Sequence, residues 1–363
     1  MKQYLDLLQN ILNNGVEKES GRANMPKTLG LSHGFIKMDL SGGFPLLTTK
    51  KMYFKGIVHE LLWFLKGDTN IKYLVDNNVH IWDGDAYRWY LKKYEEFINL
   101  ESRFQEELPY RFETQEEFID AIKKGRDYRL ISKVIGNYHL GDLGKIYGYQ
   151  WRNQNGVDQI RDVIEGLRDN PYSRYHIIDG WNKADFPEMA LPPCHLLYQF
   201  IVRPLSLYQR TELYRNNGPI HSNRYDPDYT FDEAFLDTQN VPKFYLDLNM
   251  YQRSVDSACG LPFNLASMSL FLKIISKVSN MIPGVATWIG GDTHIYTPHI
   301  ETVKEQIQRE PYKLPKIKIV KDIKTLEDIE KLTVDDFELS DYQSHPKLEY
   351  ELFVGLKANP KKV

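Results

Sequence analysis

The sequence has little of several features that would indicate particular classes of protein. It contains only two cysteines, Cys194 and Cys259, in 363 residues, which argues against a disulfide framework and against a cysteine-based zinc site. No apolar run approaches the roughly 20 residues of a membrane span, and the first residues do not begin a signal peptide. The formal net charge is only −3, so charge does not indicate a nucleic-acid partner. We therefore expect a cytoplasmic protein with no metal, no membrane contact and no required nucleic acid.

The chain is rich in apolar and aromatic residues. With 42% hydrophobic and 13% aromatic residues, disorder of the whole chain is excluded and a packed core is expected. Helical periodicity predicts amphipathic helices over 4–12 and 157–167, a buried helix over 57–65 and a central buried helix over 262–278. Alternating apolar residues predict strands within 29–40 and over 315–319.

The most informative stretch is Leu191-Pro192-Pro193-Cys194-His195, which precedes an apolar run over 196–202. A cysteine nucleophile reacts as thiolate, so it needs a nearby cation, a hydrogen-bond donor or a helix N-terminus. A lone cysteine is more often a small buried hydrophobe, so the context must decide. Three further motifs follow in order: Tyr251-Gln252-Arg253-Ser254-Val255-Asp256, then Gly260-Leu261-Pro262-Phe263-Asn264, then Gly290-Gly291-Asp292-Thr293-His294-Ile295-Tyr296.

In this order the four motifs resemble those of the thymidylate synthase family. The resemblance covers most of the chain and includes the segments 48–50, 59–65, 144–148 and 342–346. It implies an α+β fold with a large mixed sheet covered by helices, and two protomers packed sheet to sheet. It also implies one catalytic domain over residues 1–363, with insertions at about 86–140 and 204–242.

The reaction that the resemblance implies is the reductive methylation of dUMP to dTMP. The co-substrate would be 5,10-methylenetetrahydrofolate, which supplies both the carbon and the reducing hydride and leaves as dihydrofolate. Uracil C5 is a poor nucleophile, but addition of a thiolate at C6 produces an enolate that is a good one. The catalytic residues by resemblance are Cys194, Glu60, Tyr147, His195, Arg253 and Asn264.

The resemblance also assigns the residues that bind the nucleotide and the folate. Arg174 would reach the phosphate from the partner protomer, so a homodimer is implied. The nucleotide-binding residues would be Arg22, Arg174, Arg253, Ser254, Asp256, Asn264, His294 and Tyr296. The folate-binding residues would be Lys50, Ile81, Trp82 and Asp256.

Several of these residues have an alternative, purely structural interpretation. Arg22 could be a solvated loop cation, Glu60 could satisfy a buried polar network, and Asn264 could cap the start of a helix. A metal role for His294 is weak because no cluster of histidines or cysteines accompanies it. The functional interpretation of Asn264 is specific, since its amide donor and acceptor match O4 and N3–H of uracil, whereas cytosine reverses this pattern.

The chain departs from the family pattern at several positions. Tyr175 stands where a second phosphate-binding arginine is usual, and Asp85 stands where a second tryptophan is usual. The loop around Arg22 lacks its glycine-rich part, and the chain continues beyond Pro346 without the usual short apolar ending. These departures keep a dUMP hydroxymethylase open as an alternative, in which water captures the methylene and gives 5-hydroxymethyl-dUMP.

Two further hypotheses follow from the motifs. A non-catalytic nucleotide- or RNA-binding relative is the hypothesis from another class, and the chain argues against it by retaining Cys194, Glu60, Arg253 and Asn264 together. The stretch Tyr208-Gln209-Arg210-Thr211 imitates the motif at 251–254. It lacks the downstream blocks, so we expect Arg210 on the surface of the second insertion.

Overall fold

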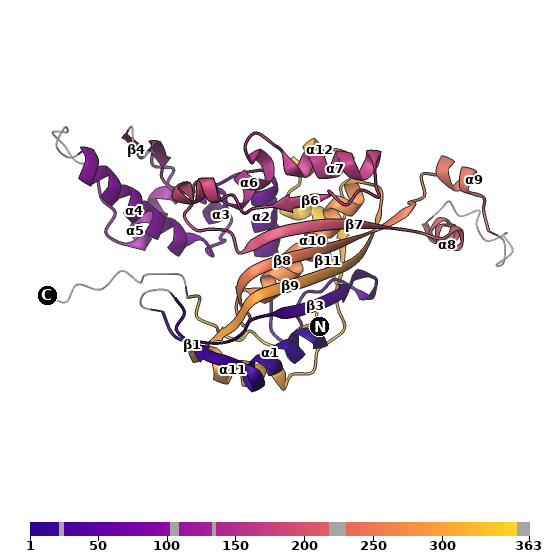
Figure 1. The fold of residues 1–363 in the computed structure, drawn as a ribbon, viewed down its shortest axis with the longest axis horizontal. Coiled ribbons are helices and arrows are strands. Elements are labelled where there is room, and N and C mark those ends of the chain that lie inside the picture. The colour runs from indigo at the N-terminus through magenta and orange to yellow at the C-terminus, as the bar shows by residue number, and fades with distance from the viewer. Residues whose placement is uncertain (22–24, 102–108, 133–135, 218–229, 354–363) are drawn as a thin grey trace.

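A seven-stranded mixed sheet forms the centre of the molecule (Figure 1). The structure is a computed structural model that describes residues 1–21, 25–101, 109–132, 136–217 and 230–353. The strand order is β1-β2-β9-β8-β7-β6, and β3 also pairs with β9. β8 and β9 run parallel, and the other neighbours run antiparallel. The strands are β1 (Val16–Lys18), β2 (Thr28–Leu31), β3 (Gly34–Asp39), β6 (Ile177–Asp179), β7 (His195–Pro204), β8 (Phe244–Asp256) and β9 (Ile282–Tyr296).

One face of the sheet packs against the long helix α10 (Leu261–Val278). Leu246, Leu248 and Met250 alternate along β8 and are fully buried, as the period of two in a strand requires. α10 connects the parallel strands β8 and β9, since a parallel pair needs a crossover. Among the described helices, α10 alone is long and apolar enough to cross a membrane, but 78% of it is buried within the fold.

The remaining helices of the central region complete the cover of this core. Trp151 stacks on Phe271 with ring centroids 5.3 Å apart, which joins α6 to α10. The predicted helix at 157–167 begins two residues later than expected, because Asp158 caps it by accepting from the Arg161 N–H. Val157 therefore precedes the helix and is exposed. These helices are α1 (Lys2–Asn14), α2 (Phe54–Leu65), α3 (Lys72–Asp76), α6 (Tyr147–Asn153), α7 (Gln159–Asp169), α11 (Ile300–Ile307) and α12 (Leu326–Glu330).

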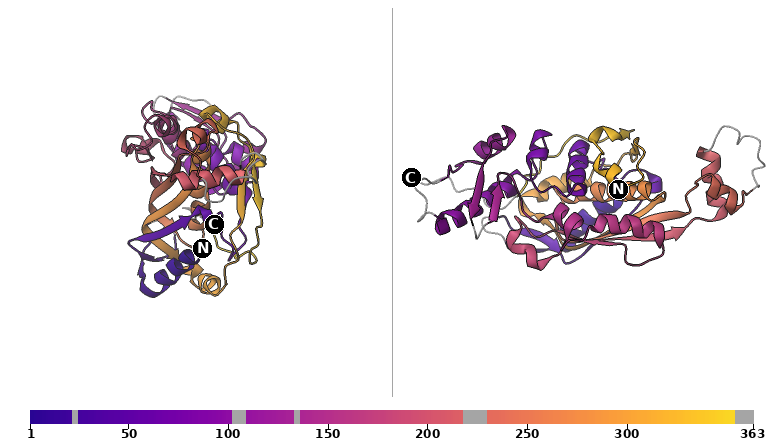
Figure 2. Two further views of the ribbon diagram at one scale, coloured as in Figure 1. Left: turned by 90° about the vertical axis from the view of Figure 1, so that its right-hand side faces the viewer. Right: turned by 90° about the horizontal axis from the view of Figure 1, so that it is seen from above.

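The region of the first predicted insertion lies at one end of the sheet (Figure 2). It contains α4 (Asp83–Glu101), α5 (Gln115–Lys123) and the hairpin of β4 (Arg129–Ser132) and β5 (Gly136–His139). Its interior is aromatic: the Tyr90 ring contacts Phe112 and Phe118 with centroids 5.5 and 5.2 Å apart. These rings belong to the main core cluster, so the region is packed against the fold.

The second predicted insertion projects from the other end of the sheet (Figure 2). It contains α8 (Leu207–Asn217) and α9 (Glu233–Thr238), with a small separate cluster around Leu236. The expectation that Arg210 lies on the surface is wrong, since only 2% of it is exposed. Its guanidinium donates to Asp237 at 2.6 Å and to the Val241 carbonyl at 3.1 Å. Arg210 therefore fastens α8 to the segment around α9.

The C-terminal part adds a hairpin and then returns to the core. The hairpin consists of β10 (Lys316–Ile319) and β11 (Phe337–Ser340). After it, the Tyr342 hydroxyl donates to the Leu47 carbonyl at 2.8 Å, and the His345 N–H donates to the Thr48 carbonyl at 2.8 Å. Four short 3-10 helices lie along the described part of the chain: η1 (Leu40–Gly42), η2 (Lys183–Glu188), η4 (Thr297–His299) and η5 (Val334–Asp336).

The second face of the sheet carries exposed apolar side chains. Phe35 is 61% exposed and Tyr251 is 40% exposed. The register aligns Phe35 with Ile289, Ile289 with Tyr251, and Tyr251 with Leu197, so these side chains form a row across β3, β9, β8 and β7. The predicted α+β architecture with a large mixed sheet is confirmed, while sheet-to-sheet packing of two protomers stays a prediction.

Candidate active site

Cys194 lies immediately before β7, in the loop that contains the two prolines. Its backbone N–H donates to the Tyr147 hydroxyl at 2.8 Å, and its carbonyl accepts from the Arg253 N–H at 2.9 Å. The thiol-bearing residue is thus held between α6 and β8, and its side chain remains partly exposed. A bulge in the pairing of β7 with β8 follows between His195 and Leu197. Such a bulge redirects side chains locally, and it begins one residue after Cys194.

Arg253 lies along the loop that carries the cysteine. Its Nε donates to the Pro193 carbonyl and its Nη2 donates to the Pro192 carbonyl, both at 2.8 Å. Trp181 lies 5.8 Å from the guanidinium. A permanent cation is therefore fixed beside the nucleophile's backbone by hydrogen bonds and by an aromatic ring.

Glu60 lies on α2 and is partly buried. The Trp82 indole N–H donates to its Oε1 at 2.9 Å. Burial raises the pKa of Glu60 to about 7, and the hydrogen bond from Trp82, which favours the carboxylate, opposes part of that shift. Both protonation states are therefore populated at neutral pH, which suits a group that transfers protons.

His195 and Tyr147 are both neutral at neutral pH. His195 is only 8% exposed, and burial lowers its pKa to about 4, although a hydrogen bond with Asn264 opposes part of the shift. Burial raises the pKa of Tyr147 well above its usual value. The two rings lie 5.4 Å apart, and Trp82 lies 5.8 Å from Tyr147. The ring contacts therefore connect the Glu60–Trp82 pair with the cysteine loop, which is the segment 191–194 before β7.

Asn264 lies in the first turn of α10, and a buried glutamine fixes its amide. The Trp288 indole N–H donates to Gln252 Oε1 at 2.8 Å, and Gln252 Nε2 donates to Asn264 Oδ1 at 3.0 Å. An indole N–H can only donate, so it sets the orientation of the Gln252 amide, which in turn sets that of Asn264. Gln252 had no predicted role, although its place in the motif beside Arg253 was a signal. The structure thus brings together all six predicted catalytic residues: Cys194, Glu60, Tyr147, His195, Arg253 and Asn264.

A second predicted pair lies at the end of β9. The rings of His294 and Tyr296 are 5.2 Å apart and nearly perpendicular, and both side chains are buried. Asp256, at the end of β8, is aligned with His294 in the parallel register. Its Oδ1 accepts from the N–H groups of Ala258 and Cys259 at 2.9 and 3.1 Å. The carboxylate is therefore fixed between the His294–Tyr296 pair and the start of α10.

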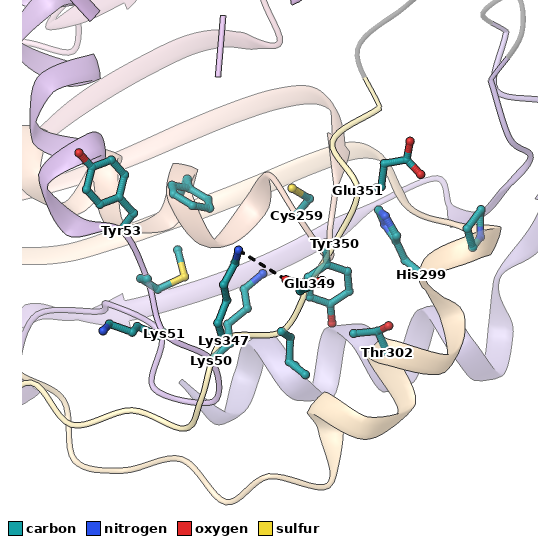
Figure 3. A pocket seen from close by; sticks show the side chains of 14 residues that line it. Lys50, Lys51, Tyr53, Cys259, His299, Thr302, Lys347, Glu349, Tyr350 and Glu351 are labelled. Atoms are coloured by element: carbon teal, nitrogen blue, oxygen red, sulfur yellow. Dashed lines mark ion pairs between the residues drawn. The ribbon is translucent and has the colours of Figure 1, made fainter. Parts of the chain in front are cut away.

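Lys50 lines a cavity of about 760 Å³ that also includes Cys259, His299 and Tyr350 (Figure 3). Its Nζ donates to the Ala258 carbonyl at 2.7 Å and lies 4.4 Å from the centre of the Tyr350 ring. Burial lowers the pKa of Lys50 to about 8. Cys259 and Phe263 both contribute to the wall of the cavity. The cavity therefore reaches the first turn of α10, where Asn264 also lies.

The chain is similar to a known protein family over most of its length. A family model described as thymidylate synthase matches residues 2–214 and 232–354. The chain belongs to the thymidylate synthase family. The prediction of an enzyme of this type is confirmed, and the stretch left unmatched, 215–231, lies within the second predicted insertion.

Several proteins that match nearly the whole length of this chain are named thymidylate synthase. The relative from Malacoplasma penetrans (strain HF-2) is 39% identical over 357 residues, which is 98% of this chain and 100% of the relative. The relative from Mycoplasma mobile (strain ATCC 43663 / 163K / NCTC 11711) is 38% identical over 354 residues, again 98% and 100%. The relative from Mycoplasma pneumoniae (strain ATCC 29342 / M129 / Subtype 1) is 38% identical over 356 residues with the same coverage.

The other predicted residues of this thymidylate synthase family member lie in less enclosed positions. Arg174 is exposed, and its carbonyl accepts from Gln199 Nε2 at 3.3 Å. Ile81 is 36% exposed just before α4, and Ser254 is partly buried on β8 beside Arg253. Arg22 lies outside the described residues. Within the described ranges, no group of three or more His, Cys, Asp or Glu side chains could hold a metal ion.

Asp85, which stands where the family usually has a second tryptophan, is charged instead of aromatic. Asp85 is 9% exposed and forms an ion pair with Arg88 one turn along α4. The Arg88 Nη2 also lies 3.4 Å from the Ala190 carbonyl, in the segment that leads to Cys194. A charged pair therefore connects α4 with the cysteine loop where the family pattern has an aromatic ring.

Proposed function

We propose that this protein converts dUMP to dTMP with 5,10-methylenetetrahydrofolate as co-substrate and dihydrofolate as the second product. The observation that carries the proposal is the network around Cys194. The Cys194 N–H donates to the Tyr147 hydroxyl, the Tyr147 ring contacts Trp82, and the Trp82 indole donates to Glu60. Membership of the thymidylate synthase family supports the same activity. The test is the identity of both products formed from dUMP and this folate.

The first step is addition of the Cys194 sulfur to C6 of uracil. The electron pair of the C5–C6 bond moves through the carbonyl at C4, so negative charge develops on O4. The amide of Asn264, whose Oδ1 already accepts from Gln252, donates from its nitrogen to O4 and accepts from N3–H. C5 becomes the nucleophile of the resulting enolate and attacks the methylene carbon of the folate.

The later steps move protons and one hydride. Glu60, with a pKa of about 7, exchanges protons with O4 and, through water, assists removal of the proton at C5. Tetrahydrofolate then leaves the methylene carbon by elimination, which leaves an exocyclic methylene on C5. Hydride from this tetrahydrofolate reduces the methylene to a methyl group, and the folate becomes dihydrofolate. The Cys194 sulfur leaves C6, and the C5–C6 double bond forms again. The neutral His195 and Tyr147 support these transfers as hydrogen-bonding groups.

We propose that the nucleotide and the folate lie side by side. Arg253 and Ser254, with Arg22 and the partner's Arg174, bind the phosphate, and His294 with Tyr296 binds the sugar hydroxyl. Asp256 contacts both ligands. Trp82, Ile81 and Asp256 hold the folate, and its glutamate tail extends toward Lys50 in the cavity of Figure 3.

We propose a homodimer in which two sheets pack face to face. The row formed by the exposed Phe35 and Tyr251 with the partly buried Ile289 and Leu197 supports this, because a contiguous apolar face on a sheet favours burial against another surface. The exposed position of Arg174 leaves it able to reach a neighbouring protomer. We also propose a cytoplasmic location, since both cysteines are free thiols.

Mixing two inactive variants is expected to restore part of the activity. Arg174→Ala protomers lack the donated arginine, and Cys194→Ser protomers lack the nucleophile, so one site in each mixed dimer receives both groups. If the protomers exchange freely, half of the dimers are mixed, and activity should rise to about a quarter of the wild-type value. Turnover is measured after exchange has been verified with differently tagged chains. Failure of the exchanged mixture to exceed its separate components would contradict a shared site.

The alternative product is 5-hydroxymethyl-dUMP. The observation that favours it is the Asp85–Arg88 pair, which replaces an aromatic ring by polar groups that attract water. Water would then capture the exocyclic methylene in place of hydride, and the folate would leave as tetrahydrofolate. The folate product therefore separates the two reactions.

A further inference from the structure

Asp292 shares its carboxylate between two functional segments. Its Oδ1 lies 3.3 Å from His294 Nδ1, and its Oδ2 lies 2.9 Å from Lys18 Nζ. Two hydrogen bonds lower the pKa of Asp292 to about 2: the one with His294 has the larger effect, and the one with Lys18 the smaller. The group is therefore a carboxylate throughout the neutral range. Asp292 had no predicted role, although it stands two residues before His294 on the same strand.

A carboxylate can only accept hydrogen bonds, so the contact with Asp292 requires the hydrogen of His294 on Nδ1. In the neutral imidazole, Nε2 is then an acceptor. The surroundings hold the ring in place, since His294 is only 8% exposed. Gly30 on β2 faces it closely: a Cβ atom at this glycine would lie 3.0 Å from the His294 Cβ. His294 therefore offers a ligand an acceptor, its Nε2, and not a donor.

We propose that Asp292 is a positioning residue that fixes the His294 tautomer, so that Nε2 accepts the proton of the sugar 3′-hydroxyl. This inference rests on the proposed function, in which His294 and Tyr296 bind that hydroxyl. Tyr296 donates its own proton to the hydroxyl oxygen, so the sugar must both donate and accept at this position. The site therefore selects nucleotides whose 3′-substituent is a free hydroxyl, and it rejects a 3′-fluoro group, which cannot donate.

The bond to Lys18 supplies a matched control. Lys18 is the last residue of β1, and its side chain is about half exposed. Lys18→Ala removes the charge partner of Asp292 but leaves the acceptor for His294 Nδ1–H. It should therefore leave the selection at the 3′-position intact.

The experiment measures Kd for dUMP and for its 3′-fluoro analogue by calorimetry, without folate. Wild type and Lys18→Ala should bind dUMP at least about tenfold more tightly than the analogue, since the analogue leaves the buried acceptor Nε2 of His294 without a partner. Asp292→Ala should reduce this ratio at least about threefold, because either tautomer is then accessible. Asp292→Asn, which retains an acceptor oxygen, should keep most of the ratio.

Two results would overturn the proposal. Equal weakening of both ligands in Asp292→Ala, with an unchanged ratio, would mean that Asp292 acts only on the fold. A wild type that binds both ligands equally would mean that Nε2 does not accept from the hydroxyl. Absence of any dUMP binding by wild type would instead reject the proposed function itself, so the two failures are distinguishable. Asp292 is partly exposed, and far-ultraviolet circular dichroism checks that each variant is folded.

Discussion

Cys194→Ser is expected to reduce dTMP formation by at least about 1,000-fold while dUMP binding stays within a few-fold of wild type. A serine hydroxyl lacks the acidity and nucleophilicity of a thiol, so addition at C6 fails. The contacts that hold the loop use the backbone N–H and carbonyl of this residue, and serine retains both. The measurement is turnover beside equilibrium binding of dUMP.

The second cysteine provides the comparison for this substitution. Cys259 lies in the wall of the cavity beside Lys50, and burial raises the pKa of its thiol to about 11, so it is protonated at neutral pH. Cys259→Ser should retain turnover, with its effect confined to the KM for the folate. Turnover of Cys194→Ser at more than a tenth of the wild-type rate would contradict the covalent mechanism.

Asn264→Asp is expected to narrow or invert the preference of the enzyme for dUMP over dCMP. Wild type should prefer dUMP by tenfold to over a hundredfold, because the wrong base leaves buried polar groups unpaired at about 1 to 3 kcal/mol. Aspartate can still accept from Gln252 Nε2, which lies 3.0 Å from the present Oδ1. The substitution therefore removes mainly the amide donor that faces O4 of uracil, and a protonated carboxyl suits N3 of cytosine.

The measurement for base choice is kcat/KM for both nucleotides. Asn264→Ala is the matched control, since it removes donor and acceptor together and should lower activity with dUMP without creating activity with dCMP. An unchanged dUMP-to-dCMP ratio in Asn264→Asp would mean that the amide only supports the start of α10 and does not select the base.

Much of the fold follows from local patterns in the sequence. The apolar run that contains Glu60 and the breaker-free run after Pro262 form helices close to the predicted bounds. The position of Cys194 at the start of a strand also follows from the turn of two prolines before an apolar run. These predictions succeed because each depends on neighbours within a few residues.

The failures have a common physical origin in contacts between distant segments. Arg210 is buried because Asp237 and two carbonyls lie beside it, and no periodic pattern relates these segments. The orientation of Asn264 depends on Gln252 and Trp288, which the parallel pairing of β8 with β9 brings together. The contact between Asp292 and His294 is different, because residues two apart in a strand share a face and this pair was predictable.

The most direct test of the account is the identification of both products of the wild-type enzyme. Purified protein is incubated with dUMP and 5,10-methylenetetrahydrofolate, and the nucleotide and folate products are identified and quantified by mass spectrometry. We expect dTMP and dihydrofolate in equal amounts. Formation of 5-hydroxymethyl-dUMP with tetrahydrofolate, or no conversion of dUMP, would contradict it.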